Sequence, residues 1–451
     1  LSGGSTIKAF KRMKFSNLPL SLTDMSAPVI GIASRTQTPK GLRLHIGLFG
    51  RRNAGKSSLI NALTNQKIAI VSDVPGTTTD PVEKACELAP IGPVVFIDTA
   101  GVDDVGELGG LRTERSLAVL GWVDVALIVC DAKALTESEL ELIRTVKSTA
   151  TPTVVVLNKA DTADAKELIA TQEQVRSLGY EPVTVCASQK LNIDAVREAI
   201  VKLAQNAVEP DLPLLGDLVH PGDTVMLVTP IDTGAPKGRM ILPQVQAIRE
   251  VLDADAKCIV VRENRLAETL TNEKEPPAFV VTDSQVVQSV VAQTPKTIPV
   301  TTFSIQMAYS KCDLVEMARG AAMIDFLRPG DKVMICETCS HHPQPDDIGR
   351  KKLPRWLAKK VGGELDIEVV VGKDFPVDLT PYKLILQCGG CVVTRRHMLT
   401  RLAQAKRQNI PMTNYGVAIS HLQGVLERAL ELHPKALKAF HEAREIFANH
   451  F

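Results

Sequence analysis

The sequence has few aromatic residues and no long apolar run. Phenylalanine, tryptophan and tyrosine make up 4% of its 451 residues, whereas apolar residues as a class make up 45%. The cores must therefore be built mainly from leucine, valine, isoleucine and alanine. No stretch of about 18 or more apolar residues occurs, so no segment is predicted to span a membrane. A chain of this length is expected to form about three domains.

The sequence also lacks an excess of either charge. Its 52 lysines and arginines nearly balance 51 aspartates and glutamates, and the formal net charge is +1. This balance argues against a large nucleic-acid footprint, which needs a basic surface. The uneven region is residues 1–40, which hold several basic residues and a single acid, Asp24. This basic N-terminal extension resembles an organelle transit segment and predicts the plastid stroma; a flexible tail in a bacterial cytoplasm is the alternative.

The nine cysteines are an odd number scattered through a long chain, which makes a disulfide framework a poor interpretation. A soluble protein in a reducing compartment fits better. Five of the cysteines lie singly in apolar surroundings and are expected to be small buried side chains. These five are Cys86, Cys130, Cys186, Cys258 and Cys312. The others gather in two segments near the C-terminal end of the chain.

A nucleotide-binding motif begins near residue 43. Residues 43–49 alternate and favour a strand, and residues 58–63 favour a helix. Between them lies a G-x-x-x-x-G-K-[ST] phosphate loop in the strand–loop–helix context that this motif requires. Lys56 should reach the β- and γ-phosphates, and Ser57 should bind Mg²⁺. The residues expected to surround the phosphates are Gly50, Asn53, Ala54, Gly55, Lys56, Ser57 and Ser58.

Two motifs that sense the γ-phosphate follow. Residues 73–80 form a polar, turn-rich loop suited to a nucleotide-sensing switch, in which Thr78 can complete the Mg²⁺ shell. Residues 94–97 predict a buried strand that leads into Asp-Thr-Ala-Gly. In that motif Asp98 is the carboxylate on the metal side, and the Gly101 N–H is placed to sense the γ-phosphate.

The base-recognition motifs come next. Residues 126–129 and 153–157 predict buried strands, and the second ends in Asn158-Lys159-Ala160-Asp161. Asp161 can accept two hydrogen bonds from guanine, whereas adenine would leave that carboxylate unpaired. This selects GTP over ATP. Residues 183–188 end the last strand, and the Ala187 backbone is expected to supply the second guanine contact.

One residue of Ras-like enzymes is missing. Val102 stands where a glutamine would orient the attacking water, so hydrolysis must be slow or be helped by another group. This unit resembles the GTPases related to Era and the tRNA-modifying MnmE, in which a hydrophobic residue replaces that glutamine. The resemblance implies that Asn53 holds a K⁺ ion, which would supply positive charge where an arginine finger would otherwise lie.

The pattern changes after residue 205. Residues 206–217 are acidic, contain proline and predict a linker. Strands are predicted at residues 224–228, 258–261 and 279–281, with helices at 244–252 and 285–291. Alternation of strands and helices indicates a small parallel α/β domain. No catalytic constellation occurs in it, so the simplest interpretation is a dimerisation domain.

The last unit places cysteines after two strands. Residues 332–335 and 384–386 predict buried strands that end just before residues 336–343 and 387–391. In an open parallel sheet the C-terminal ends of strands face one crevice, where ligands bind. A helix is predicted over residues 395–405. The two cysteine segments are therefore expected to meet.

Three kinds of site fit these cysteines. Structural zinc is one, because it usually takes four cysteine or histidine ligands, here Cys339, Cys388, Cys391 and His341. A redox dithiol is another. An iron–sulfur cluster is the third, since thiolates from separated segments also hold [4Fe–4S] clusters. Cys336 is a spare thiol, expected to be buried at its strand end.

The chain from residue 40 onward resembles the HydF family of [FeFe]-hydrogenase maturation GTPases. The resemblance rests on Cys-Ser-His at 339–341, Cys-Gly-Gly-Cys at 388–391, and the segments 347–350, 354–357 and 235–239. It implies three α/β domains, the first with a P-loop GTPase fold and the others with small parallel sheets. Their expected bounds are 41–205 for GTP binding, 217–322 for dimerisation and 326–451 for iron–sulfur cluster binding.

The resemblance implies a scaffold that hydrolyses GTP, with Mg²⁺, a [4Fe–4S] cluster and K⁺ as cofactors. It would form a homodimer, receive a diiron precursor from the radical-SAM maturases HydE and HydG, and deliver it to the hydrogenase apoprotein. No nucleic acid or membrane partner is expected. Gln387 stands where the family has a second histidine, so His341, Asp346, water or an incoming ligand would fill the fourth iron site. The alternative is a ribosome- or tRNA-associated GTPase with a structural zinc site.

Overall fold

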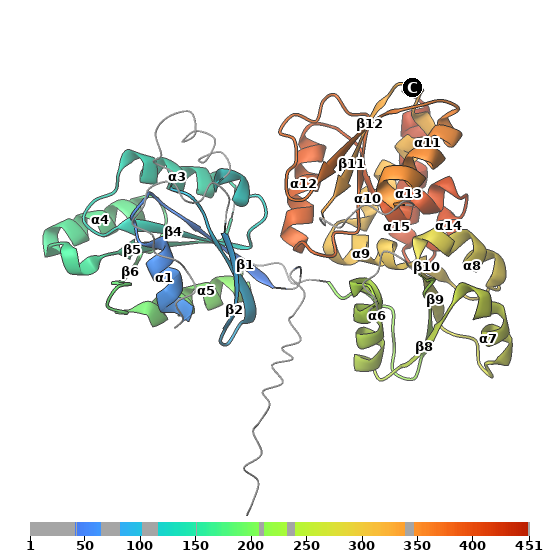
Figure 1. Ribbon diagram of the computed structural model, residues 1–451, viewed down its shortest axis with the longest axis horizontal. Coiled ribbons are helices and arrows are strands. Elements are labelled where there is room, and N and C mark those ends of the chain that lie inside the picture. Colours follow the sequence, from blue (N-terminus) through green and yellow to red (C-terminus); the bar gives the residue numbers. More distant parts are fainter. Residues whose placement is uncertain are drawn as a thin grey trace, which may run out of the picture. The chain divides into compact units, whose positions relative to one another are not determined.

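Three β-sheets organise the part of the chain that the structure describes (Figure 1). This computed structural model describes residues 41, 43–64, 82–101, 116–149, 151–206, 212–231, 240–338 and 347–449. The basic extension, the predicted switch loop at 73–80, Val102 and residues 339–346 lie outside these ranges. The predicted class of three α/β units, with a P-loop GTPase fold first and two small parallel sheets after it, is confirmed.

The first sheet has the strand order β2-β3-β1-β4-β5-β6. Its edge strand β2 pairs antiparallel with β3, and every other pairing is parallel. The strands are β1 (Leu44–Phe49), β2 (Val82–Leu88), β3 (Gly92–Asp98), β4 (Val125–Asp131), β5 (Thr153–Asn158) and β6 (Val183–Thr184). The central strands are apolar on both sides because helices cover both faces.

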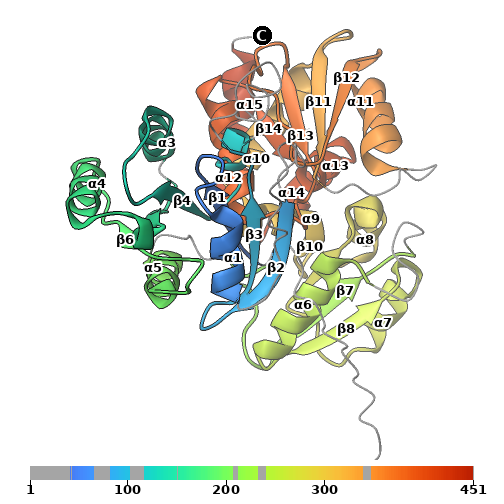
Figure 2. The ribbon, with the colours of Figure 1, turned by 60° about the vertical axis from the view of Figure 1, so that its left-hand side comes forward.

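Alternate residues of these strands pack against different helices. Ile46 and Leu48 of β1 share a core with apolar residues of α1 and α5, and helix α1 lies over this face in Figure 2. Val95 and Ile97 of β3 share another core with α3 and α4. The helices are α1 (Lys56–Thr64), α3 (Glu137–Ser148), η2 (Ala160–Thr162), α4 (Ala165–Ser177) and α5 (Ile193–Asn206). Phosphate loop and base motif thus lie at the same strand ends of one rigid sheet.

The second sheet is parallel and has the order β10-β9-β7-β8. Its elements are β7 (Thr224–Val228), α6 (Leu242–Asp253), β8 (Lys257–Val261), η3 (Glu263–Arg265), α7 (Leu266–Asn272), β9 (Phe279–Thr282), η4 (Ser284–Val286), α8 (Val287–Gln293), β10 (Val300–Thr302) and α9 (Phe303–Lys311). Leu214 and Leu215, within the predicted linker, are buried in its core and donate their backbone N–H groups to Glu250. The C-terminal part of the predicted linker is therefore packed against the second unit.

The third sheet is also parallel, and Figure 2 shows its strands side by side in the order β12-β11-β13-β14. The strands are β11 (Lys332–Glu337), β12 (Asp366–Val371), β13 (Leu384–Gln387) and β14 (Met412–Asn414). In the register of the two central strands Cys336 lies opposite Gln387. The segments that carry the cysteines therefore leave from neighbouring strand ends, as predicted.

Helices pack closely around this third sheet. They are α10 (Leu314–Ala321), η5 (Ala322–Phe326), the π-helix η6 (Ile348–Lys352), α11 (Leu353–Val361), α12 (Arg395–Arg407), α13 (Tyr415–Leu422), α14 (Leu426–Ala429) and α15 (Pro434–Ala448). Residues of α9, α10, α12 and α15 share one core with Met334 and Ile385. A Cβ on Gly320 would lie 2.0 Å from the Met412 carbonyl oxygen, so glycine lets α10 approach β14.

Most predicted elements are confirmed to within a few residues. The difference is β6, which is two residues long where residues 183–188 were expected to end a strand. Strands β2, β10, β12 and β14, which are short or polar, and most of the helices around the sheets were not predicted. None of the described helices is long and apolar enough to cross a bilayer. The predicted domain bounds remain predictions.

Candidate functional site

The phosphate loop, residues 50–55, joins β1 to α1 through two glycines with positive φ. Gly50 has φ +144° and Gly55 has φ +93°. A Cβ on Gly50 would lie 2.2 Å from the Val129 carbonyl oxygen, and one on Gly55 would lie 2.2 Å from the side-chain nitrogen of Asn158. A larger residue at either position would displace the backbone of the loop.

Lys56 lies at the start of α1 and folds back over this loop. Its Nζ donates to the carbonyl oxygens of Gly50 at 2.9 Å and Arg51 at 3.0 Å, and the residue is buried. The ammonium group is thus held beside a helix N-terminus, where backbone N–H groups already favour an anion. This placement suits a lysine that contacts phosphate oxygens.

The two residues predicted on the magnesium side lie in contact. Ser57 Oγ donates to Asp98 Oδ2 at 2.7 Å. They meet because β1 and β3 are paired, with Leu48 opposite Asp98. Gly101 follows the same strand and is buried. Thr78, the third predicted magnesium contact, lies outside the described residues.

Asn158 links the phosphate loop to the base-recognition loop. Its Nδ2 donates to the Ala54 carbonyl oxygen at 2.9 Å, and its Oδ1 accepts from the Ala187 N–H at 3.0 Å. These two hydrogen bonds hold together the two loops that would surround a nucleotide. If the Ala187 N–H contacted guanine, its hydrogen bond to Asn158 Oδ1 would have to be shared or replaced.

Asp161 presents both carboxylate oxygens to hydrogen-bond donors. Oδ1 accepts from Cys186 Sγ at 3.0 Å, and Oδ2 accepts from Gln189 Nε2 at 3.2 Å. Two acceptors side by side are what the two donors of guanine require. Cys186 is buried here, as expected from its apolar surroundings, and it also holds this carboxylate.

The sequence did not point to Asp131 and Glu139, which tie the two nucleotide motifs together. Asp131 Oδ2 lies 3.3 Å from Lys159 Nζ and 3.1 Å from Arg51 Nη2, and Glu139 Oε1 lies 3.4 Å from Arg51 Nε. Lys159 adopts a left-handed backbone with φ +62°. The available signal was a carboxylate at the C-terminal end of the buried strand β4, where the ligand crevice of such a sheet lies.

The remaining loop residues are less enclosed. Asn53, the predicted potassium ligand, is exposed and has φ +61°, a left-handed conformation that asparagine tolerates. Ser58 is half-buried on the first turn of α1. The side chain of Asn53 can therefore be reached by an ion at the mouth of the loop.

Cys388 follows β13 and receives several hydrogen-bond donors on its sulfur. Its Sγ lies 3.2 Å from the Thr338 N–H nitrogen, 3.0 Å from Thr338 Oγ1 and 3.5 Å from Gln387 Nε2. The Cys388 N–H donates to the Cys336 carbonyl oxygen at 2.9 Å, which holds the two strand ends together. Hydrogen bonds to the sulfur are typical of cysteines that hold a metal or a cluster, so the residues present fit a metal ligand.

Cys336 and Cys391 are the two other described thiols near Cys388. Cys336 is fully buried in the core, and this burial raises its pKa to about 12, as expected for a spare thiol. Burial, followed by the charge of Cys388, raises the pKa of Cys391 to about 12. A cation that replaces the thiol proton would be needed to make Cys391 a thiolate near neutral pH.

The other predicted ligands lie in the segment that the structure leaves out. Cys339, His341 and Asp346 fall within residues 339–346, which are not among the residues that the structure describes. Among the residues that are described, no group of three or more His, Cys, Asp or Glu side chains is arranged to hold a metal ion. The predicted four-ligand set remains a prediction.

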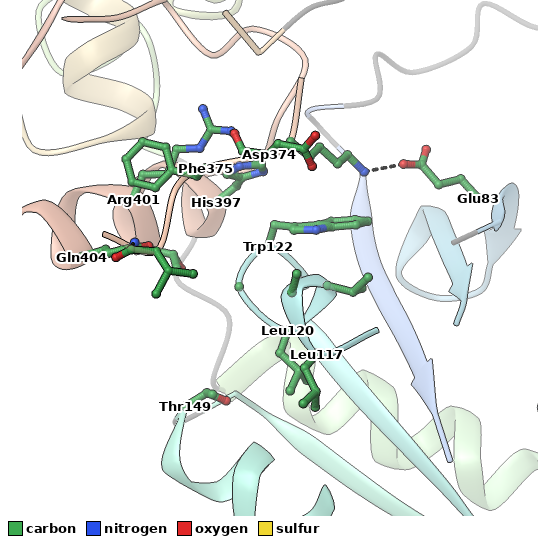
Figure 3. A pocket seen from close by; sticks show the side chains of 16 residues that line it. Glu83, Leu117, Leu120, Trp122, Thr149, Asp374, Phe375, His397, Arg401 and Gln404 are labelled. Carbon is green, nitrogen blue, oxygen red and sulfur yellow. Dashed lines mark hydrogen bonds and ion pairs between the residues drawn. The ribbon is translucent and has the colours of Figure 1, made fainter. Parts of the chain in front are cut away.

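A pocket of about 850 Å³ is lined by residues of the first and third units, among them Glu83, Trp122 and His397 (Figure 3). Lys373, after β12, lies 3.2 Å from the ring centroid of Trp122 and forms an ion pair with Glu83, drawn as a dashed line. His397 of α12 stacks against Trp122, with ring centroids 6.4 Å apart. Arg396 Nη2 also donates to Thr151 Oγ1 at 3.0 Å. These contacts join β2 and the segment before β4 to the unit that carries the cysteines.

Several curated GTPases are similar to the first unit. Trichormus variabilis tRNA modification GTPase MnmE is 38% identical over 167 residues, which cover 36% of this chain and 34% of that protein. Wolinella succinogenes GTPase Der is 34% identical over 172 residues, or 36% of each chain. The chain thus spans about a third of the length of these relatives. A crystal structure of Aquifex aeolicus Era aligns over 50% of this chain and 97% of that chain, with 20% identity and a TM-score of 0.32.

Family comparisons cover all three sheets. Residues 45–159 match the family described as 50S ribosome-binding GTPase, which places a GTPase domain at this end. Residues 214–312 match the hydrogen maturase F dimerization domain, and residues 315–432 match the hydrogen maturase F tetramerization domain. With a GTPase domain followed by both of these domains in one chain, this protein belongs to the hydrogen maturase F (HydF) family.

Proposed function

We propose that this chain is a GTP-hydrolysing scaffold that holds a [4Fe–4S] cluster and carries a diiron precursor to the [FeFe]-hydrogenase apoprotein. The observation that carries this proposal is the pairing of β11 with β13, whose ends bring Thr338, the residue before Cys339, next to Cys388. This pairing occurs in a chain of the hydrogen maturase F family that also holds a GTPase domain. Ligands of open α/β sheets bind at such paired strand ends.

The proposed cluster ligands are Cys339, Cys388 and Cys391, with His341 as a candidate fourth. The hydrogen bonds to the Cys388 sulfur support this assignment, because donors to sulfur stabilise the charge of a thiolate-bound cluster. A bound cluster would supply an iron site at which the cargo can be held. Gln387 is fully buried and turned toward Arg401, so it is not proposed as a ligand.

The GTPase cycle is proposed to use Lys56 on the phosphates, Ser57 and Thr78 on Mg²⁺, and Asp98 beside the metal. Turnover should be slow because Val102 cannot orient water, and a K⁺ ion held by Asn53 should accelerate it. We expect faster GTP hydrolysis in KCl than in NaCl, with the difference lost in Asn53→Ala. Phosphate release measured in both salts tests this, and equal rates in wild-type protein would contradict it.

The proposed partners follow from the family. Self-association through the dimerization and tetramerization domains would present two or more cysteine sites in one particle. The maturases HydE and HydG would load the diiron cargo, and the hydrogenase apoprotein would accept it. A plastid location is proposed only from the basic residues 1–40, which lie outside the described part of the chain.

Iron content tests the cluster. Protein purified without oxygen should be brown and contain about four irons per chain for a [4Fe–4S] site. Cys388→Ala should lose most of this iron, while GTP turnover continues. Cys336→Ala is the matched control: it removes a nearby buried thiol that is not a proposed ligand, so the iron should remain.

Two outcomes would overturn the proposal. A wild-type iron content in Cys388→Ala would show that Cys388 does not hold the cluster. A colourless wild-type protein that contains zinc would instead favour a structural zinc site, and binding to ribosomes or tRNA would then support the alternative function. The absorption spectrum and metal analysis of one preparation separate these cases.

A further inference from the structure

Gln387 lies at the end of β13, immediately before Cys388, and its side chain is completely buried. Its Oε1 accepts a hydrogen bond from Arg401 Nη1 at 3.0 Å. Arginine has donors and no acceptor, so the amide oxygen must face Arg401. The amide NH₂ is therefore turned the other way, where Nε2 lies 3.5 Å from Cys388 Sγ and 3.5 Å from the Cys336 carbonyl oxygen.

Arg401 lies on α12 and is only 3% exposed. Its Nη2 donates to the carbonyl oxygens of Gly372 at 2.9 Å and Asp374 at 3.2 Å, in the loop after β12. Its Nε is buried and has no hydrogen-bond partner among the described residues, and the guanidinium lies beside the pocket in Figure 3, 5.0 Å from the ring centroid of Phe375.

A buried guanidinium is costly unless nearby negative groups offset its charge. Burial lowers the pKa of Arg401, and the sulfur atoms of Cys336 and Cys388 and the carboxylate of Asp374 oppose this effect. A cluster bound through Cys388 would add negative charge near the guanidinium.

We propose that Arg401 and Gln387 are positioning residues for the Cys388 sulfur. Gln387 donates an N–H···S hydrogen bond in place of ligating iron, and Arg401 holds the amide in that orientation and supplies a buried positive charge. The inference rests on the proposed cluster. Hydrogen bonds and positive charge near a cluster sulfur stabilise the reduced state, so the pair raises the reduction potential of the cluster.

The test is a potentiometric titration of the full-length protein after anaerobic loading with iron and sulfide, followed by electron paramagnetic resonance. Arg401→Gln and Gln387→Leu should retain iron but shift the potential to more negative values and alter the resonance signal. Arg401→Lys keeps the charge without the planar fork, so its shift should be smaller. Because the two residues act through one hydrogen bond, the potential of the double variant should shift by less than the sum of the shifts of the two single variants.

Gln404→Ala is the matched control. Gln404 lies one turn along α12, lines the same pocket and donates to the carbonyl oxygens of Pro376 and Val377, but within the described ranges it forms no hydrogen bond with Gln387 or Cys388. Its potential should equal that of the wild type. If the potential of Gln404→Ala shifted as much as that of Arg401→Gln, the effect would come from the loop after β12, and the inference would be overturned.

Further outcomes also decide the matter. Unchanged potentials in iron-loaded Arg401→Gln and Gln387→Leu would overturn the positioning role and leave the scaffold function standing. Loss of iron from both variants, with GTP turnover intact as a check on folding, would also overturn it, because three thiolate ligands should remain. A wild-type protein that binds no iron would refute the proposed function itself.

Discussion

At the scale of residues, the nucleotide site depends on side chains that hold two loops at fixed places. Lys56 donates to the backbone of its own loop, and Asn158 connects that loop to the one that carries Ala187. Both side chains are buried, so their positions are determined by packing before any ligand binds. Such preorganisation lowers the entropy cost of placing a phosphate.

Replacement of Lys56 tests this site. Lys56→Ala should lower GTP hydrolysis by about 100-fold or more, because one charged donor to the transferring phosphate is removed. Steady-state phosphate release measures this. Lys202→Ala, an exposed lysine on α5, is the control and should keep wild-type turnover. The iron content of Lys56→Ala should be unchanged, and wild-type hydrolysis in this variant would rule out the phosphate-loop assignment.

At the scale of elements, helices around the third sheet converge on one carboxylate. Asp325 of η5 lies 3.0 Å from His421 Nε2 on α13, 2.8 Å from Lys360 Nζ on α11 and 3.2 Å from Arg444 Nε on α15. Burial would raise the pKa of Asp325, but hydrogen bonds from His421 and Lys360 outweigh it and hold this pKa well below its usual range. The charged carboxylate therefore stabilises the packing of three helices.

This arrangement predicts a dependence of stability on pH. The folded-state pKa of Asp325 is lowered, so its contribution is present above the unfolded value of about 4 and is lost as the pH falls below it. Asp325→Asn should lower the free energy of unfolding by about 1–3 kcal/mol at pH 7. Urea titrations should show this difference in unfolding free energy between wild type and Asp325→Asn at pH 7 and 5, and a smaller difference at pH 3. An equally large difference at pH 3 would contradict the assignment.

At the scale of the whole molecule, several side-chain contacts join the GTPase unit to the cysteine unit. Lys373 contacts both Trp122 and Glu83, and Glu83 lies on β2 close after the predicted switch loop. On its other side the backbone at Gly372 and Asp374 is bound by Arg401. A change in the switch loop could therefore reach the loop after β12 through β2 and Lys373.

The two tryptophans of the chain allow this contact to be measured. In a Trp356→Phe background, Trp122 is the remaining tryptophan and is 8% exposed. Lys373→Ala should make its fluorescence more accessible to acrylamide, because a cation–π contact and an ion pair, together about 1–2 kcal/mol, are removed. Lys383→Ala, an exposed lysine of the same unit, should leave quenching unchanged. Equal quenching in all three proteins would show that this contact does not form in solution.

Sequence alone determined the features that depend on local pattern. Buried strands such as β4 and β5 are continuous apolar runs, and Gly50, Gly55 and Lys56 occur at spacings that a phosphate loop requires, so both were predictable. The order of GTPase domain, second unit and cysteine unit also followed from motifs along the chain. Strands β2 and β12 were missed because their exposed or half-buried residues lack such a pattern.

Only the tertiary structure decided how distant polar groups pair. Arg401 with Gln387, Asp131 with Lys159, and Lys373 with Trp122 are separated along the chain and carry no spacing signal. Their contacts arise because parallel strands bring their C-terminal ends to one edge and helices return over that edge. For Gln387 the consequence is chemical, because the hydrogen bond from Arg401 to its amide oxygen turns its amide N–H toward the sulfur of Cys388.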